Sequence, residues 1–540
     1  MIADLEKMKA DIRLEFETAL DFVTGEQART ASADQIERGL FTLLLSLGAK
    51  LLQLFFQMRT QTCSRDPITL EDGQTLPYHS EQKRTYFSVF DRIPLWRPYF
   101  YQSGLGGQAP LDAELALSSD RYSDLLRDLV EYLAVYVPSY GKAMSILARI
   151  LEFKVSTRVV QEMVAEDALD VEAYYAQKPP PDAKDEAEIL VIQADGKGVP
   201  MVLEQAAEPQ VRLGKGQKRG RKKEAIVTTV YTIASNPRTP EAVVTSFFRQ
   251  DDATERNQEA SSPPGPQNKH VWATLDGKDA ALSRLTQQVE ARKGEHTQEK
   301  VALTDGDPAL QQRVETYFPD FELILDFIHP NEYLWEVANK LFGETDERRN
   351  QWVADQTLLM LSGQTEQIIA DFRTLAEAPQ RTKGQREKLT KTANYFENNL
   401  PYMHYQTYLA QGWPIASGVI EGACRHFVKD RFELSGMRWT QEGAENLFRL
   451  RAVAENGDWE TYLLFRRRQR HKRLYSLLFP EQGPLEFQAL EPHAPPSPHQ
   501  PRPAMSPRTT TKDELPADSS VTITVTSDDF SAYQTLPLAL

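Results

Sequence analysis

The sequence predicts a mixed α/β protein whose central sheet is flanked by mainly helical regions. Between residues 187 and 329, short β-branched apolar runs alternate with segments of helical periodicity, which is typical of a sheet covered by helices. Residues 110–178 and 330–400 show helical periodicity without a strand signal. These patterns predict an α/β core that a helical insertion interrupts and that a mainly helical region precedes.

The N-terminal part predicts helices around a small β element. Residues 1–60 have the periodicity of two helices, and the aromatic segment 84–102 predicts a hairpin. Residues 140–166 predict two helices joined by a short turn, with Ser156 as N-cap of the second. This shape suits a helix-turn-helix that would present Arg158 and Gln161 to a DNA major groove, and it equally suits an ordinary helical hairpin.

The core is expected to begin after a proline-rich linker at 176–188. Its expected strands end at Asp195 and cover 226–234, 269–275, 300–308 and 320–329, with helices at 278–293, 309–317, 416–432 and 441–454. The expected regions are a helical region (1–80), a β element with DNA-binding helices (81–178), the first part of the core (187–329), the insertion (330–410), the completion of the core (411–475) and a disordered, proline-rich tail (485–540).

Charge and cysteine content narrow the function classes. The net charge of −15 argues against a nucleic-acid binder when the chain is taken whole. Two basic runs, 211–223 and 465–473, nevertheless make a phosphate partner plausible, although such runs are commonly solvated faces or linkers. The two cysteines exclude a disulfide framework, and no uninterrupted apolar run reaches the length of a membrane span. We therefore expect a protein of a reducing cytoplasm.

Acidic residues follow two of the expected strands. In the segment ILVIQADGKG the expected strand ends at Asp195, and in the segment KVALTDGDP the expected strand ends at Asp305. A turn role is the simplest explanation, because Asp-Gly is a common turn dipeptide. If the strands are neighbours, however, both carboxylates emerge at one edge, near Glu421 on the expected 416–432 helix. Three close carboxylates repel one another unless divalent cations neutralise them, and Mg²⁺ prefers such oxygen ligands.

These segments carry a family resemblance. The chain resembles bacterial insertion-sequence transposases of the ISKra type, which are DDE enzymes with an RNase H-like catalytic core. The resemblance covers most of residues 80–475 and is strongest in the last of its motifs. The motifs are ADGKGVPM (194–201), GKGQKRGRKKEAIVTTVYTI (214–233), LTDGDPAL (303–310), LDFIHPNEYLW (325–335) and GWPIASGVIEGACRHFVKDRFELSGMRWTQEGAENLFRLRA (412–452).

The resemblance implies a catalytic triad of Asp195, Asp305 and Glu421, which would hold Mg²⁺, with Mn²⁺ as a substitute. Asp305 closes the expected fourth strand, where such a core has its second acid. Asp326 and His329 match an Asp-x-x-His motif of related enzymes and are expected to support the site. In the rival assignment, Asp326 replaces Asp305 as the metal ligand.

The same resemblance implies DNA contacts from basic side chains, against the alternative of a solvated surface. The expected DNA-binding residues are Lys215, Lys218, Arg219, Arg221, Lys222, Lys223, Arg425 and Lys429. The last two follow Glu421 by four and eight residues and should share its helix face. Cys424 is expected to be a small buried residue, and Trp439 is expected to be a core residue, with stacking on a flipped base as the alternative.

The function implied is that of a DNA transposase. It would bind the terminal inverted repeats of its element and catalyse metal-dependent strand cleavage and strand transfer. Its partners would be transposon ends and target DNA, with no membrane, and it would act as a homodimer or higher oligomer in the bacterial cytoplasm, associated with the nucleoid. The alternatives are a non-catalytic DNA-binding regulator that descends from a transposase, and a simple RNase H-like nuclease.

Overall fold

The computed structural model describes residues 4–70, 72–151, 154–202, 222–248 and 264–476. Within these ranges the chain is a mixed α/β protein, as the sequence predicts. The expected disordered tail, 485–540, lies outside the described residues. Most of the expected core elements are present within a few residues of their expected bounds. Helix α8 (Pro240–Phe247), which begins after the N-cap Thr239, is an additional element.

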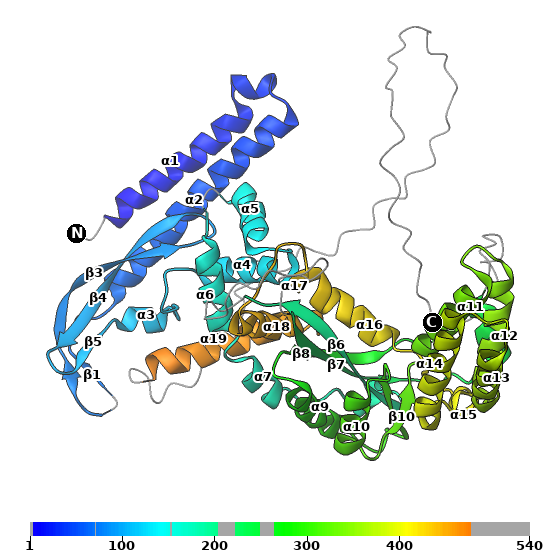
Figure 1. Cartoon of the computed structure of the whole chain (residues 1–540). Helices are drawn as coiled ribbons and strands as arrows, with labels where there is room; N and C mark the ends of the chain where they lie inside the picture. Colours follow the sequence, from blue (N-terminus) through cyan, green and yellow to red (C-terminus); the bar gives the residue numbers. More distant parts are fainter. Residues whose placement is uncertain (1–3, 71, 152–153, 203–221, 249–263, 477–540) are drawn as a thin grey trace, which may run out of the picture. The chain divides into compact units, whose positions relative to one another are not determined.

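A five-stranded sheet forms the centre of the α/β part, in the spatial order β10-β9-β6-β7-β8 (Figure 1). The strands β6, β7 and β8 pair antiparallel, whereas β9 and β10 continue the sheet from β6 in parallel. The bounds are β6 (Ile189–Pro200), β7 (Lys222–Ile233), β8 (Gln267–Thr274), β9 (Glu299–Thr304) and β10 (Glu322–Leu325). Helix α9 (Lys278–Arg292) precedes β9, and α10 (Pro308–Tyr317) connects β9 to β10.

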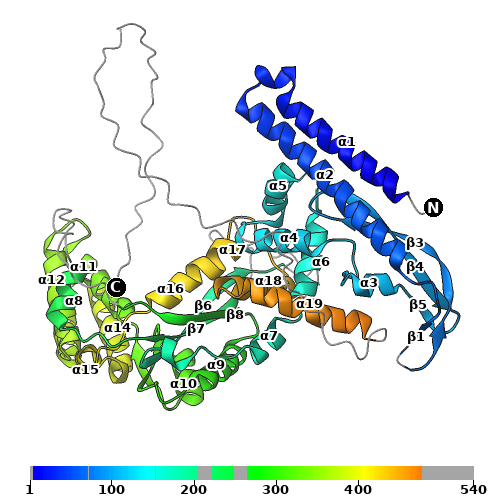
Figure 2. The same ribbon diagram turned by 180° about the vertical axis from the view of Figure 1, so that it is seen from behind.

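Both faces of this sheet are covered, which explains the unbroken apolar run at the start of β6. Leu190 and Ile192 share a buried cluster with residues of α9 and α10. Ile189 and Val191 point to the opposite face, because successive strand residues alternate, and belong to the cluster formed with the helical insertion. Figure 1 and Figure 2 show α9 and α10 together below the sheet.

The predicted helical insertion follows β10 directly. Its helices bury the larger share of one apolar cluster, with Leu334, Met360, Phe372 and Phe396 among its least exposed side chains. The bounds are α11 (Ile328–Phe342), α12 (Arg348–Leu361), α13 (Thr365–Glu377), α14 (Lys383–Asn399) and α15 (Tyr405–Ala410). The chain then returns to the sheet through residues 411–417.

The N-terminal segments form the expected helices and hairpin. Two long helices, α1 (Leu5–Thr24) and α2 (Ala33–Thr62), precede a three-stranded antiparallel sheet. Its strands are β3 (Tyr78–Phe87), β4 (Arg92–Gln102) and β5 (Gly106–Gln108), so the β element begins slightly before the expected boundary at 81. Two short strands, β1 (Ile68–Thr69) and β2 (Thr75–Leu76), pair with each other.

Helix α2 is long and apolar enough to cross a membrane by length and composition, which the sequence prediction did not anticipate. One such helix near the N-terminus is weak evidence, because other helices of soluble proteins meet the same criterion. Lys50 lies in the middle of α2 and forms an ion pair with Glu15 of α1. The apolar helix α2 thus contains a charged side chain, Lys50, which is already paired with an acid of α1.

The helical region before the core shares one apolar cluster with the C-terminal helices, so these two predicted regions form a single packing unit. Within it, α5 (Tyr140–Ile150) and α6 (Thr157–Asp167) form the predicted helix pair, and the Ser156 hydroxyl caps α6 by accepting the Val159 N–H. The remaining helices are α3 (Pro110–Glu114), α4 (Asp124–Tyr136), α7 (Val171–Gln177), α16 (Gly418–Ala423), α17 (Asp430–Phe432), α18 (Gln441–Glu455) and α19 (Trp459–Tyr475).

Most arginines of the basic run on α19 pair with acids of the protein, whereas Arg468 and Lys472 are exposed. Arg466 is 1% exposed and forms ion pairs with Glu131 of α4 and Asp167 of α6. Arg127 joins the cluster, with its Nη2 2.7 Å from Asp167 Oδ1. The outer arginines of the run are also paired, Arg470 with Asp124 and Arg473 with Asp170. The sequence of the run alone did not indicate that Glu131, Asp124, Asp167 and Asp170 pair with its arginines.

Removal of Arg466 is expected to destabilise the fold, because it leaves buried carboxylates without one of their cations. Arg466→Met should lower the free energy of unfolding by about 3–5 kcal/mol. The matched control is Arg468→Met, which changes an exposed arginine two residues away on the same helix. Urea denaturation followed by circular dichroism measures both variants, and equal effects would contradict a structural role for Arg466.

Candidate functional site

Strand register places three carboxylates at one edge of the sheet. The last parallel pair of β6 and β9 is Gln193 with Leu303, and Asp195 and Asp305 each lie two residues beyond it. On the other side of β9, Asp326 follows the last pair of β10, and its N–H donates to the Thr304 carbonyl at 2.9 Å. Because side chains alternate along a strand, all three carboxylates belong to the face that the helical insertion covers.

Asp195 does not end its strand, which corrects both the expected strand end and the turn explanation. β6 continues for five residues, and each of these residues pairs with β7. Gly196 and Gly198 serve this close pairing: a Cβ added at Gly196 would lie 2.3 Å from Glu224 Oε1, and one at Gly198 would lie 2.8 Å from Lys222 Cδ. The glycines leave room for these two side chains of β7, and only the parallel pairing with β9 stops before Asp195.

A buried glutamine fixes the helix that carries Glu421 over the sheet. Gln193 is 1% exposed, and its Oε1 accepts the backbone N–H of Ile420 at 2.9 Å. Its amide nitrogen donates to the hydroxyl of Tyr231 on β7 at 3.1 Å. Gln193 lies two residues before Asp195 and on the same face, so one strand supplies both a carboxylate and the anchor of the opposing helix.

The thiol of Cys424 lies 3.2 Å from Asp195 Oδ2 and donates a hydrogen bond to it. Cys424 is fully buried, as predicted, and burial followed by the charge of Asp195 raises the pKa of its thiol well above the ordinary range. The thiol is therefore neutral at physiological pH. Its contact with Asp195 gives α16 a second point of attachment to β6.

Asp326 has its hydrogen-bonding capacity filled. Its Oδ1 accepts the N–H groups of Ser417 (3.0 Å) and Ile328 (3.2 Å), and its Oδ2 lies 2.7 Å from Ser417 Oγ and 2.9 Å from His329 Nδ1. Its side chain is fully buried. Asp305, in contrast, accepts at Oδ1 from the N–H of Asp307, the one hydrogen bond of its carboxylate among the described residues. The bonding pattern favours Asp305 as a cation ligand and Asp326 as its support.

Distances alone favour another set. Asp326, His329 and Glu421 each offer an atom within 4.8 Å of the others, as a metal site requires. The hydrogen bond to Asp326 raises the pKa of His329 to about 9 and keeps the imidazole protonated near neutral pH in the metal-free protein. Mg²⁺ prefers oxygen ligands, so the carboxylates suit it better than the imidazole nitrogen does. His329 is then a cation placed among carboxylates.

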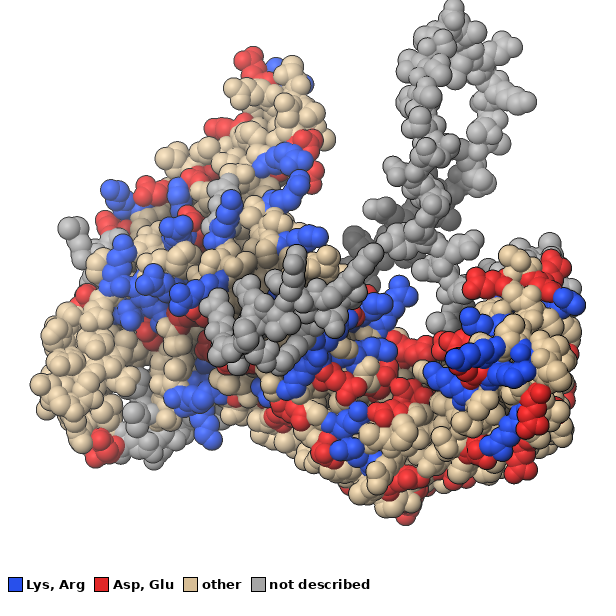
Figure 3. All heavy atoms as spheres, in the orientation of Figure 1, with Lys and Arg blue, Asp and Glu red and all other residues tan. Residues whose placement is uncertain are grey.

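Asp305 and Glu421 form no ion pair among the described residues, and their pKa values are raised. Burial, followed by the charge of Asp195, raises the pKa of Asp305. Burial, followed by the charge of Asp326, raises the pKa of Glu421. Figure 3 shows Asp and Glu side chains gathered where Figure 1 places α16. A bound cation would relieve this repulsion, so the cluster favours cation binding.

Three residues of the site escaped the sequence prediction, namely Gln193, Lys197 and Ser417. Lys197 Nζ lies 3.0 Å from Asp195 Oδ2. Ser417 Oγ lies 3.3 Å from Glu421 Oε1 and also contacts Asp326, so one hydroxyl contacts two of the acids of the site. A signal existed for two of them, because Gln193 is a polar residue inside an apolar strand and Ser417 precedes Glu421 by one helical turn.

The predicted DNA-binding residues have different outcomes. Lys215, Lys218, Arg219 and Arg221 lie outside the described residues. Lys222 forms an ion pair with Glu433, and Lys223 Nζ lies 2.8 Å from Gln441 Oε1. Arg425 and Lys429 are exposed, although the segment Cys424–Lys429 is a π-helical turn and interrupts the predicted continuous α-helix. Their relation to the face of Glu421 therefore departs from the spacing of an ordinary α-helix.

Comparison with known proteins adds no identification. No family model matches the chain, and no curated protein matches it significantly.

The protonation of His329 can be measured directly. In metal-free protein, the His329 imidazole should titrate near pH 9, and Asp326→Asn should lower its pKa, because the main stabilising hydrogen bond is lost. NMR of histidine labelled at Cε1 measures both values, with His329→Gln used to assign the signal.

The same shift predicts a stability effect of known sign. Because the pKa is raised on folding, His329 stabilises the fold most below its unfolded value of about 6.5 and less as the pH rises towards 9. The difference in unfolding free energy between wild type and His329→Gln should therefore shrink between pH 6 and pH 9.5. A constant difference would contradict a protonated His329.

Proposed function

We propose that the protein is a DDE-type DNA transposase with an RNase H-like core. The single observation that carries this proposal is the register that brings Asp195 and Asp305 to one edge of the sheet, on the face towards the helix of Glu421. β9 is the fourth strand of this sheet in chain order, and the resemblance expects the second acid at the end of that strand. A helical insertion separates the sheet from the third acid, as in such transposases.

The donor chemistry of this edge fits hard divalent cations. Asp195, Asp305 and Glu421 are carboxylates, and burial together with neighbouring acids raises the pKa of the latter two. Mg²⁺ or Mn²⁺ would be held by these three residues. When bound, such ions supply activation of a water or 3′-hydroxyl nucleophile and stabilisation of the leaving oxygen in phosphodiester chemistry.

The other residues of the site would position these ligands. Ser417 contacts Glu421 and Asp326, and Asp326 in turn contacts His329. This chain of hydrogen bonds restricts the Glu421 side chain from the side of β10. Gln193 holds the Glu421 helix against β6. The rigidity of this support matters, because phosphoryl transfer depends on positioning and on the neutralisation of charge.

DNA contacts in this proposal come from exposed cations near the site. Arg425 and Lys429 are exposed on the segment that follows Glu421. They would contact the phosphate backbone, which sets affinity and orientation without reading sequence. Arg158 and Gln161 of α6 are also exposed and would add contacts to the same DNA.

Substitution of the triad tests the proposal. Asp195→Asn, Asp305→Asn and Glu421→Gln should abolish cleavage of the element's ends and strand transfer, with end binding retained. Asp326→Asn should reduce the rate by about 10–100-fold, as expected for a supporting residue. Asp279→Asn, an exposed acid on α9, is the matched control. Transposition between replicons and cleavage of labelled ends give the activities.

Binding of Mn²⁺ to the same variants supplies a measurement that is independent of activity. Calorimetric titration should show weaker binding in Asp305→Asn than in Asp326→Asn, and the reverse order would make Asp326 the ligand. Cleavage of the ends without joining would identify a nuclease. End binding by wild type without any metal-dependent cleavage would identify a regulator and contradict the proposal.

A further inference from the structure

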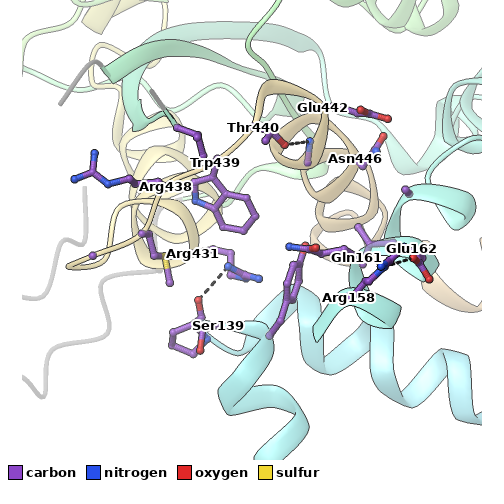
Figure 4. Close-up of a pocket in the computed structure, with 18 residues that line it drawn as sticks. Ser139, Arg158, Gln161, Glu162, Arg431, Arg438, Trp439, Thr440, Glu442 and Asn446 are labelled. Carbon is purple, nitrogen blue, oxygen red and sulfur yellow. Dashed lines mark hydrogen bonds and ion pairs between the residues drawn. The ribbon is translucent and has the colours of Figure 1, made fainter. Parts of the chain in front are cut away.

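A second hollow lies away from the carboxylates, between α6 and the segment that joins α17 to α18. The cavity has a volume of about 690 Å³, within the range of small-molecule sites. Figure 4 shows its lining, in which Trp439 and Arg431 lie opposite the α6 side chains. The residues that carry the argument are Tyr140, Arg158, Gln161, Arg431, Arg438 and Trp439.

The floor of this cavity holds a buried cation with an unused donor. Arg431 is 1% exposed, and it donates from Nε to the Ala134 carbonyl and from Nη1 to the Pro138 carbonyl, each at 3.0 Å. Its Nη2 is buried and has no hydrogen-bond partner among the described residues. An unpaired buried donor is costly, and a ligand acceptor that reached it would remove that cost.

No carboxylate in the described ranges pairs with Arg431, so its charge is also uncompensated. The guanidinium instead lies beside two aromatic rings, 5.1 Å from the centroid of Tyr140 and 5.0 Å from that of Trp439, and these rings pack edge to face with centroids 6.1 Å apart. Aromatic walls with a fixed guanidinium are suited to a flat ligand that has acceptor atoms on its edge. Nucleobases have this character, and arginine is their commonest specific donor.

The rim of the cavity supplies charge for a phosphate. Arg158 and Arg438 are exposed lining residues on opposite sides, from α6 and from the segment before α18. Gln161 adds an amide that both donates and accepts hydrogen bonds. Glu162 pairs with Arg158, with 2.9 Å between Arg158 Nε and Glu162 Oε1, so Arg438 is the rim cation without an ion-pair partner in the described part of the chain.

The cavity is connected to the carboxylate site through β6. The N–H of Trp439 donates to the Pro200 carbonyl at 2.9 Å, and the N–H of Val202 donates to the Trp439 carbonyl at 2.8 Å. Pro200 lies five residues beyond Asp195 on the same strand, which corresponds to about 17 Å. About five stacked nucleotides span this length at 3.4 Å each.

We propose that this cavity binds one unpaired nucleotide of a DNA strand that reaches the carboxylate site about five nucleotides further along. The base enters edge first, and an acceptor on its edge takes the free N–H of Arg431. Arg438 and Arg158 hold the adjoining phosphates at the rim. This inference rests on the proposed function for the presence of DNA, and it adds a separate site that selects unpaired nucleotides.

Binding of a fluorescent single strand tests the proposal. The probe is an eight-nucleotide strand with one 2-aminopurine, mixed with the full chain in metal-free buffer and compared with the same strand fully paired. Wild type should bind the single strand more tightly and change its emission. Arg431→Lys should weaken binding by about tenfold, because it keeps the charge and loses the fork of donors.

Because Arg431 is buried, variants at the rim keep the test decisive if Arg431→Lys fails to fold. Arg438→Ala and Gln161→Ala change exposed side chains and should each weaken binding severalfold, whereas Arg468→Ala, an exposed arginine on α19, should not. Equal affinity for a strand with an abasic site at the probe position, or displacement by inorganic phosphate alone, would show a phosphate site and overturn the proposal. Equal affinity for the fully paired strand would also overturn it.

The two proposals fail separately. Probe binding is measured in metal-free buffer, whereas cleavage and joining are measured with Mg²⁺, so each proposal has a readout of its own. Probe binding without metal-dependent cleavage would leave the cavity proposal intact and contradict the transposase. If the wild type cleaves and joins DNA but Arg438→Ala and Gln161→Ala leave probe binding unchanged, the transposase proposal stands and the cavity proposal is contradicted.

Discussion

The rest of the α/β structure depends on one strand that takes part in two ladders of opposite direction. β6 pairs antiparallel with β7 along all of its twelve residues and parallel with β9 along its first five. The parallel ladder ends where the side chains change from apolar to acidic. The antiparallel ladder continues beyond that point, so Asp195 lies on a paired strand rather than in a loop. A site on a strand is held more precisely than one on a loop.

The buried charged groups of this protein differ in whether other groups of the protein pair with them. The acids at the sheet edge gain few neutralising partners from the protein, whereas the acids of α4 and α6 are matched by Arg127 and Arg466. The close acids at the sheet edge are therefore energetically costly without a ligand, whereas the acids of α4 and α6 are paired within the protein. The same contrast separates Arg431, which retains an unused donor, from Arg451, whose guanidinium contacts backbone carbonyls of three residues.

Local patterns in the sequence predict the elements well and their contacts poorly. The apolar run of β6, the Ser156 cap and the helices of the insertion follow from periodicity and capping within short windows. The continuation of β6 past Asp195 depends on its pairing with β7, which no local pattern reveals. The role of Arg466 depends on acids more than 290 residues away. The preference for Asp305 over Asp326 required the hydrogen bonds of both carboxylates, whereas motif spacing left the two assignments open.

The π-helical turn after Glu421 has a consequence for how this chain is compared with relatives. A turn closed by bonds to the fifth residue holds one residue more than a turn of α-helix. Cys424–Lys429 therefore adds length between Glu421 and the aromatic stack of Phe427, Phe432 and Phe448. A relative without the wide turn would reach the same stack with one residue fewer. An alignment without a gap inside this helix could then match either Glu421 or the aromatic stack to its counterpart, but not both. Counting backwards from the stack would misplace the counterpart of Glu421 by one position.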